Sequence, residues 1–169
     1  MPHHLIISDI PLSKPPGCHN TRIIFPGEPV TPCIGCFGCW VKTPGQCVRR
    51  DSYQNTGAWL ADAKKLILIS RCVYGSLSPF IKSVLDRAIS YVQPYFEIYH
   101  GEMHHRRRYP GEIELEVLAY GQTSDQERNT LRDILTANAV NLHGRVGALR
   151  FFNTREELPF DQIYGKEPF

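Results

Sequence analysis

The chain has 169 residues, of which 42% are hydrophobic and 21% are charged, and 19 basic against 17 acidic side chains give a formal net charge of +2. This size and composition predict one globular domain and exclude a disordered chain. The near balance of charge offers no field that would draw the protein to nucleic acid or to a membrane surface, so we expect its chemistry to be local.

The amino terminus and the cysteine content indicate the compartment. The segment MPHHLIISDI has no basic region and an apolar run of only three residues, which does not fit a signal peptide. No stretch of the sequence is apolar for long enough to span a bilayer. We therefore expect a cytoplasmic protein, in which the six cysteines bind metal or do redox chemistry rather than form disulfides.

Apolar runs of strand length alternate with amphipathic helical patterns along the chain. The clearest strand is KLILIS at 65–70, and the helix expected at 79–91 carries its apolar residues on one face. This alternation favours a parallel sheet covered by helices, with any ligand beyond the carboxyl ends of the strands, where the strand order reverses. The expected strands are 4–10, 21–25, 65–70, 113–120 and 145–152, and the expected helices are 56–64, 79–91 and 125–141.

Three segments depart from the regular alternation. The connection at 11–20, PLSKPPGCHN, is short for a parallel crossover and contains three prolines, so we expect no full helix there. Residues 27–52 form a long loop with four of the six cysteines, and long loops of this sort are usually functional. We take 1–154 as the domain and 155–169 as a tail, whose spaced aromatic residues suggest docking on a neighbouring chain.

Two motifs carry a resemblance to a known family. They are CIGCFGCWVKTPGQC at 33–47, followed by Asp51, and SRCVYGSLSPFIKSVLDR at 70–87. With them the sequence resembles the iron-sulfur flavoprotein and NADPH-dependent FMN reductase branch of the flavodoxin-like superfamily, over roughly 32–152. The resemblance implies an α/β three-layer sandwich with a five-stranded parallel sheet and a shortened first crossover here, FMN at the strand ends, and a homo-oligomer.

The resemblance places the loops after the third and fourth strands on either side of the flavin ring. Gly75 would let the backbone approach a ligand closely, and Tyr74 could stack on a planar ring. The alternative is an ordinary strand-to-helix turn with a surface tyrosine. No side chain is expected to act as an acid or base. The expected cofactor-binding residues are Ser70, Arg71, Cys72, Val73, Tyr74, Gly75, Ser76, Tyr120, Gly121 and Thr123.

The cysteine loop has the spacing C-x2-C-x2-C-x7-C. Three closely spaced thiolates and a fourth further along can hold a 4Fe-4S cluster. Four thiolates also satisfy zinc, although zinc usually takes two separated C-x2-C pairs. The third interpretation is that the cysteines only pack around Phe37 and Trp40 as small buried side chains. The candidate metal ligands are Cys33, Cys36, Cys39 and Cys47.

The family's turn for the FMN phosphate, rich in Ser and Thr and containing Gly, has no counterpart after Ile10, where prolines stand instead. Substitute anchors would be Ser13, Lys14 and Asn20, or the arginine run 106–108. We favour the arginines, which a neighbouring subunit could deliver, because guanidinium groups bind phosphate through paired hydrogen bonds.

Three functional hypotheses follow. The first is an FMN-dependent NAD(P)H oxidoreductase or flavin reductase, in which hydride passes to the flavin from NAD(P)H or another electron donor. The second is an electron carrier or metal-binding module that uses the four-cysteine loop. The third is a flavodoxin-like scaffold that has lost its cofactor and acts through oligomer contacts, and the missing phosphate turn is its main support.

Overall fold

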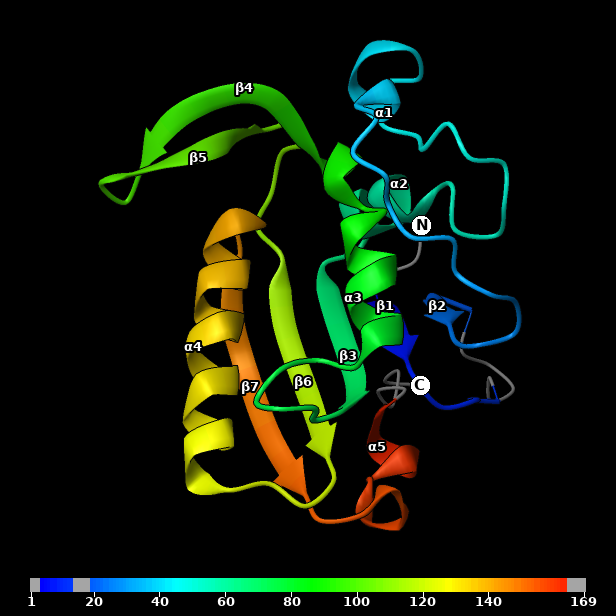
Figure 1. Ribbon diagram of the computed structural model, residues 1–169, viewed down its shortest axis with the longest axis vertical. Coiled ribbons are helices and arrows are strands. Elements are labelled where there is room, and N and C mark those ends of the chain that lie inside the picture. The colour runs from blue at the N-terminus through cyan, green and yellow to red at the C-terminus, as the bar shows by residue number, and fades with distance from the viewer. Residues whose placement is uncertain (1–3, 14–18, 164–169) are drawn as a thin grey trace.

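The computed structural model describes residues 4–13 and 19–163. Five strands form one sheet in the order β2-β1-β3-β6-β7, and every neighbouring pair is parallel (Figure 1). This is the flavodoxin strand order, so the expected fold class is confirmed. The strands are β1 (His4–Ser8), β2 (Thr21–Ile24), β3 (Lys65–Arg71), β6 (Glu114–Tyr120) and β7 (Arg145–Phe152).

Three helices cover one face of this sheet: α2 (Thr56–Asp62), α3 (Pro79–Asp86) and α4 (Asp125–Asn141). Their apolar residues pack with alternate residues of β1, β3 and β6 into the larger core cluster. Ser124 caps α4 and exchanges hydrogen bonds with Glu127, which explains why this helix begins where the sequence predicts. Helix α3 is shorter than expected, because the chain passes into a 3₁₀ turn, η1 (Ile89–Tyr91).

The other face of the sheet carries a much thinner cover. Leu12 from the first connection packs there with Leu158 and Ile163, which flank or belong to the short α5 (Phe160–Ile163). Residues 9–13 and 19–20 of that connection form no helix, in agreement with the shortened crossover. Part of the tail as far as Ile163 therefore packs on its own sheet, and its docking on a neighbouring chain stays a prediction. Residues 164–169 lie outside the described residues.

A two-stranded hairpin leaves the body between α3 and β6. It pairs β4 (Val92–Tyr99) with β5 (Glu102–Arg107) in antiparallel fashion, between the expected helix at 79–91 and the expected strand at 113–120, where the sequence predicts no element. The cysteine loop contributes one short helical turn, α1 (Gly38–Val41), and Trp40 Nε1 donates a hydrogen bond to the Val92 carbonyl at 3.0 Å. In Figure 1 the arrowheads of β6 and β7 point down, whereas the hairpin and α1 lie above the opposite ends of the strands.

Among the described residues, no helix has both the length and the apolar character needed to cross a membrane.

Candidate functional site

The first candidate site is the carboxyl edge of the sheet, where a single carboxylate joins three strands. Asp9 follows β1, and its Oδ2 accepts the backbone N–H of Arg71 at 2.7 Å. Its Oδ1 accepts the hydroxyl of Tyr120 at 3.0 Å. The boundary between β1 and β3 is where the strand order reverses, and this is the place at which folds of this kind bind their ligands. Asp9 thus lies at the expected ligand position.

Tyr120 is held as a protonated donor to Asp9. Burial, followed by the charge of the nearby Asp9 carboxylate, raises the pKa of Tyr120 well above its usual range. Its ring, like those of Phe152 and Phe160, packs against the smaller core cluster on the thinly covered face of the sheet. The side chain that the resemblance places beside a flavin ring is therefore half-buried and joined to the end of β1.

The loop after β3 turns across the end of β6 and packs on α4. The Cys72 N–H donates to the Tyr120 carbonyl at 2.8 Å, and the turn beyond it places both Tyr74 and Gly75 at positive φ. A Cβ on Gly75 would lie 2.9 Å from the Cβ of Thr130, so only glycine fits there. Tyr74, at the tip of the loop, is 91% exposed. The turn therefore presents one aromatic ring on a fixed backbone.

The structure gathers the predicted flavin residues along this edge, but several already have structural partners. The Ser70 hydroxyl accepts the Ser78 N–H at 2.8 Å and so fixes the start of α3. Thr123 Oγ1 accepts a hydrogen bond from Arg128 at 2.9 Å. Burial raises the pKa of the Cys72 thiol. Exposed side chains at the edge belong to Arg71 and Tyr74, whereas Val73, Ser76, Tyr120, Gly121 and Thr123 are half-buried.

The first residues after β1 offer no free backbone N–H group to an FMN phosphate. The Asp9 N–H donates to the Ile69 carbonyl, and the Ile10 N–H donates to the Ser8 hydroxyl. The Arg71 N–H donates to Asp9 itself. A buried phosphate needs such donors for itself, and these are engaged within the chain. Of the substitute anchors expected in the first connection, Lys14 lies outside the described residues.

The arginine run does not lie at this edge either. Arg106 and Arg107 belong to the hairpin, and Arg107 donates to the Gly111 carbonyl at 2.7 Å. Arg108 Nε donates to the Ser90 carbonyl at 2.9 Å, beside η1 at the far end of α3. Within one chain these guanidinium groups are therefore at the opposite end of the molecule from the loop that carries Tyr74.

The second candidate site is a cavity of about 340 Å³ at the opposite end of the sheet. All four cysteines of the loop line it, together with the apolar side chains of Phe37, Trp40 and Val48. Burial, and then the charges of the neighbouring thiols, raise the pKa of Cys39. Within the described ranges, no three His, Cys, Asp or Glu side chains are arranged to hold a metal ion. The four thiols do share one cavity, but they have no ready-made coordination geometry.

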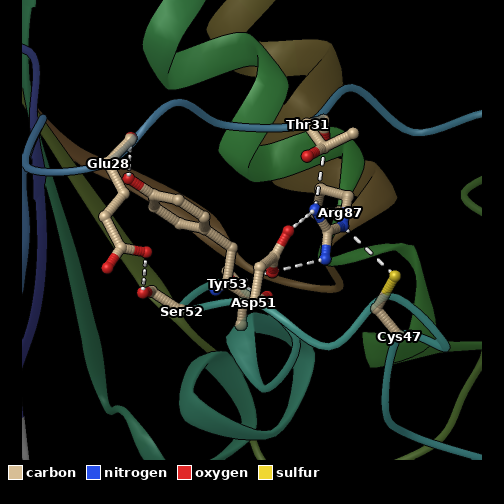
Figure 2. A network of polar contacts seen from close by, with 8 residues as sticks. Glu28, Thr31, Cys47, Asp51, Ser52, Tyr53 and Arg87 are labelled. Atoms are coloured by element: carbon tan, nitrogen blue, oxygen red, sulfur yellow. Dashed lines mark hydrogen bonds and ion pairs between the residues drawn. The ribbon is translucent and has the colours of Figure 1, made fainter.

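A buried arginine joins this cavity to the body of the domain (Figure 2). The Arg87 side chain is fully buried and makes two hydrogen bonds of 2.8 Å to the carboxylate of Asp51. It also donates to the Thr31 carbonyl at 2.9 Å and to Cys47 Sγ at 3.2 Å. The paired guanidinium holds the pKa of Asp51 below its usual value. Sequence reasoning gave this pair no role, although one charged residue among the apolar positions at the end of α3 was a usable signal.

The two candidate sites are separated by the length of α3. The exposed loop at 71–76 precedes the first turn of this helix, whereas Asp86, Arg87 and Ile89 at its other end line the cysteine cavity. Within one chain the carboxyl edge of the sheet and the cysteines therefore do not meet.

Comparisons with known proteins support the fold. No protein-family model and no curated protein matches the chain. Solved structures do match, among them an FMN-dependent NADH-azoreductase from Bacillus anthracis str. Ames Ancestor in complex with FMN. This structure aligns with a TM-score of 0.54 and 12% identity, over 95% of the present chain and 92% of the azoreductase chain. At this identity the similarity shows a shared flavodoxin-like fold.

Proposed function

We propose that the protein is a flavin-dependent NAD(P)H oxidoreductase that binds a flavin ring at the carboxyl edge of its sheet. The observation that carries this proposal is the exposed Tyr74, held at positive φ beside the carboxyl ends of β3 and β6. Support also comes from the similar structure, which is an FMN-dependent NADH-azoreductase. A flavin supplies the hydride chemistry itself, so the chain needs no acid or base side chain.

The residues at the edge would bind and orient the ring. Tyr74 offers a flat apolar surface for stacking, and the contact of Gly75 with α4 keeps that surface in place. Arg71 is exposed at the end of β3, and its Cγ is 3.6 Å from the position of a Cβ on Gly121. This brings a cationic side chain and a positive-φ glycine to the same edge, so that backbone and guanidinium can approach one ligand together.

The experiment is a flavin titration followed by NADH oxidation, with two tyrosine variants. Tyr74→Ala should weaken flavin binding by up to about tenfold, because one stacking contact is lost. Tyr95→Ala is the matched control, since Tyr95 is also exposed but lies on the hairpin at the other end of the molecule. Equal effects of the two substitutions, or a wild-type protein that binds no flavin, would contradict the proposal.

A second candidate function is a metal centre in the cysteine cavity. The observation that favours it is that Cys33, Cys36, Cys39 and Cys47 all line one cavity, next to the buried guanidinium of Arg87. Four ionised thiols repel one another, and a 4Fe-4S cluster or zinc would neutralise them. Protein purified without oxygen should then contain stoichiometric metal, and Cys36→Ser should lower that content. Metal-free wild-type protein would favour thiols that only pack.

We also propose that the protein forms a homo-oligomer through one face of the hairpin. The rings of Tyr99 and His143 have centroids 4.9 Å apart and are tilted by 50°, so one face of the hairpin packs on the segment just after α4. The opposite face carries Phe96, Ile98 and Met103, which are 59 to 74% exposed. An isolated two-stranded ribbon is marginal in water, so a second copy seated on this apolar face would stabilise it.

A further inference from the structure

We propose that Asp9 is a specificity-determining residue that makes the carboxyl edge select flavins without a phosphate over FMN. The inference rests on the proposed function, because it concerns which member of the flavin class that edge accepts. It differs from what the similar azoreductase shows, since that structure is a complex with FMN.

The first step concerns position. In the flavodoxin strand order, the flavin nucleotide lies at the boundary between β1 and β3. Asp9 is the first residue after β1, and its carboxylate is fixed there by the backbone N–H of Arg71 at 2.7 Å and the hydroxyl of Tyr120 at 3.0 Å. A negatively charged group of the protein therefore stands where this fold would place a ligand.

The second step concerns hydrogen-bond donors. A phosphate taken out of water must be given N–H or O–H groups, and a helix start or an open turn normally provides them. Here Ser70 takes the N–H of Ser78 at the start of α3, at 2.8 Å. Ser8 takes the N–H of Ile10 at 3.2 Å. Among the described residues at this edge, the N–H groups of Ile10 and Ser78 are thus already used by the chain.

The third step concerns charge. A flavin phosphate brings close to two negative charges, and the Asp9 carboxylate would repel them. Tyr120 does not offset this, because it remains a neutral donor to Asp9. Arg71 and Arg155 lie near enough to Tyr120 to lower its pKa, so these two cations of the described residues lie close to the edge. Arg155, however, is bonded to Glu156 at 2.8 Å. Of these two, the exposed guanidinium of Arg71 therefore remains to balance Asp9.

The edge can therefore recognise the ring of a flavin rather than its phosphate. Stacking on Tyr74 requires only a planar surface, and riboflavin has the same ring as FMN without the phosphate. The protein should therefore handle a flavin as a ligand that exchanges with solution, rather than as a phosphate-anchored prosthetic group.

The test measures dissociation constants for riboflavin and FMN at low salt, where charge repulsion is least screened. The wild-type protein should bind riboflavin at least as tightly as FMN. Asp9→Asn removes the charge but keeps an oxygen that can accept the Arg71 N–H, and it should tighten FMN by about tenfold while riboflavin changes little. Asp62→Asn makes the same change of charge on the exposed end of α2 and should leave the ratio unchanged.

A second variant separates charge from structure. Tyr120→Phe removes the hydroxyl that binds Asp9 but leaves the carboxylate, so the ratio of the two affinities should stay as in the wild type. Circular dichroism and thermal unfolding would check that each variant folds. A wild-type preference for FMN of tenfold or more would overturn this inference alone, as would an equal effect of Asp9→Asn on both flavins. Binding of neither flavin would overturn the proposed function as well.

Discussion

The two ends of the sheet differ in what their buried and half-buried polar groups bind. At the carboxyl edge, Asp9 and Tyr120 join the ends of neighbouring strands, Ser70 binds the start of α3, and one aromatic ring is left exposed. At the opposite end, Arg87 and Asp51 support a cavity that four thiols line. The first arrangement suits recognition of a flat ring, and the second suits a charged or metallic group. The cysteine loop and the loop at 71–76 therefore lie at opposite ends of the sheet, and each supports a proposal of its own.

The largest expected loss of folding stability follows from replacing the buried Arg87. Arg87→Met should lower the free energy of unfolding by about 3 kcal/mol, because Asp51 loses the guanidinium that pairs with it and the Thr31 carbonyl loses a donor. Chemical denaturation would measure the difference. Arg145→Met is the control: Arg145 is 59% exposed, and its ion pair with Glu114 should contribute less than about 1 kcal/mol. Similar losses in both variants would contradict the importance of burial.

The ion pair of Arg87 and Asp51 also determines how the folding stability depends on pH. The pKa of Asp51 is lowered in the folded state, so its contribution to stability is present above the unfolded pKa, near 4, and is lost as the pH falls toward the lower folded value. Wild-type protein should therefore lose stability in acid more steeply than Arg87→Met does.

A smaller loss is expected at the loop of the carboxyl edge. Gly75→Ala should cost about 2 kcal/mol, because φ is +71° and the new Cβ would meet Thr130 and the Glu127 backbone. The same variant should weaken flavin binding, since Tyr74 would lose its fixed position. Gly27→Ala is the control, because nothing lies within 4 Å of a Cβ there. Thermal unfolding of the two variants gives the comparison, and unchanged stability of Gly75→Ala would show that the loop can rearrange.

Substitutions on the exposed face of the hairpin should have the smallest effect on folding stability. They should nevertheless weaken self-association. The double substitution Phe96→Ser and Ile98→Ser should weaken self-association by tenfold or more with little change in thermal stability, because both side chains are already exposed in one chain. Light scattering at micromolar concentration would measure the mass of each protein. A monomeric wild type would remove the oligomer proposal, and Val41→Ser, at an exposed residue outside the hairpin, would serve as the control.

Much of the fold was accessible from the sequence. Strand β7 and helix α4 have the predicted bounds, since each combines a regular apolar pattern with a local start or stop signal. Strand β1 ends two residues earlier than expected because the Ser8 hydroxyl binds the N–H of Ile10 and turns the chain. The hairpin is not among the elements expected from the sequence, because several of its apolar residues face solvent and so give no burial pattern.

The sequence by itself determined the parallel α/β architecture, the shortened first crossover and the gathering of cysteines in one loop. These properties depend on local periodicity, on prolines and on short spacers, all of which are readable along the chain. Only the tertiary structure brought Asp9 to Tyr120, 111 residues away, and Arg87 to Asp51, 36 residues away. It also placed the loop at 71–76 and the cysteine cavity at opposite ends of α3. Contacts between distant residues follow from the order in which strands pair, and no local pattern encodes that order.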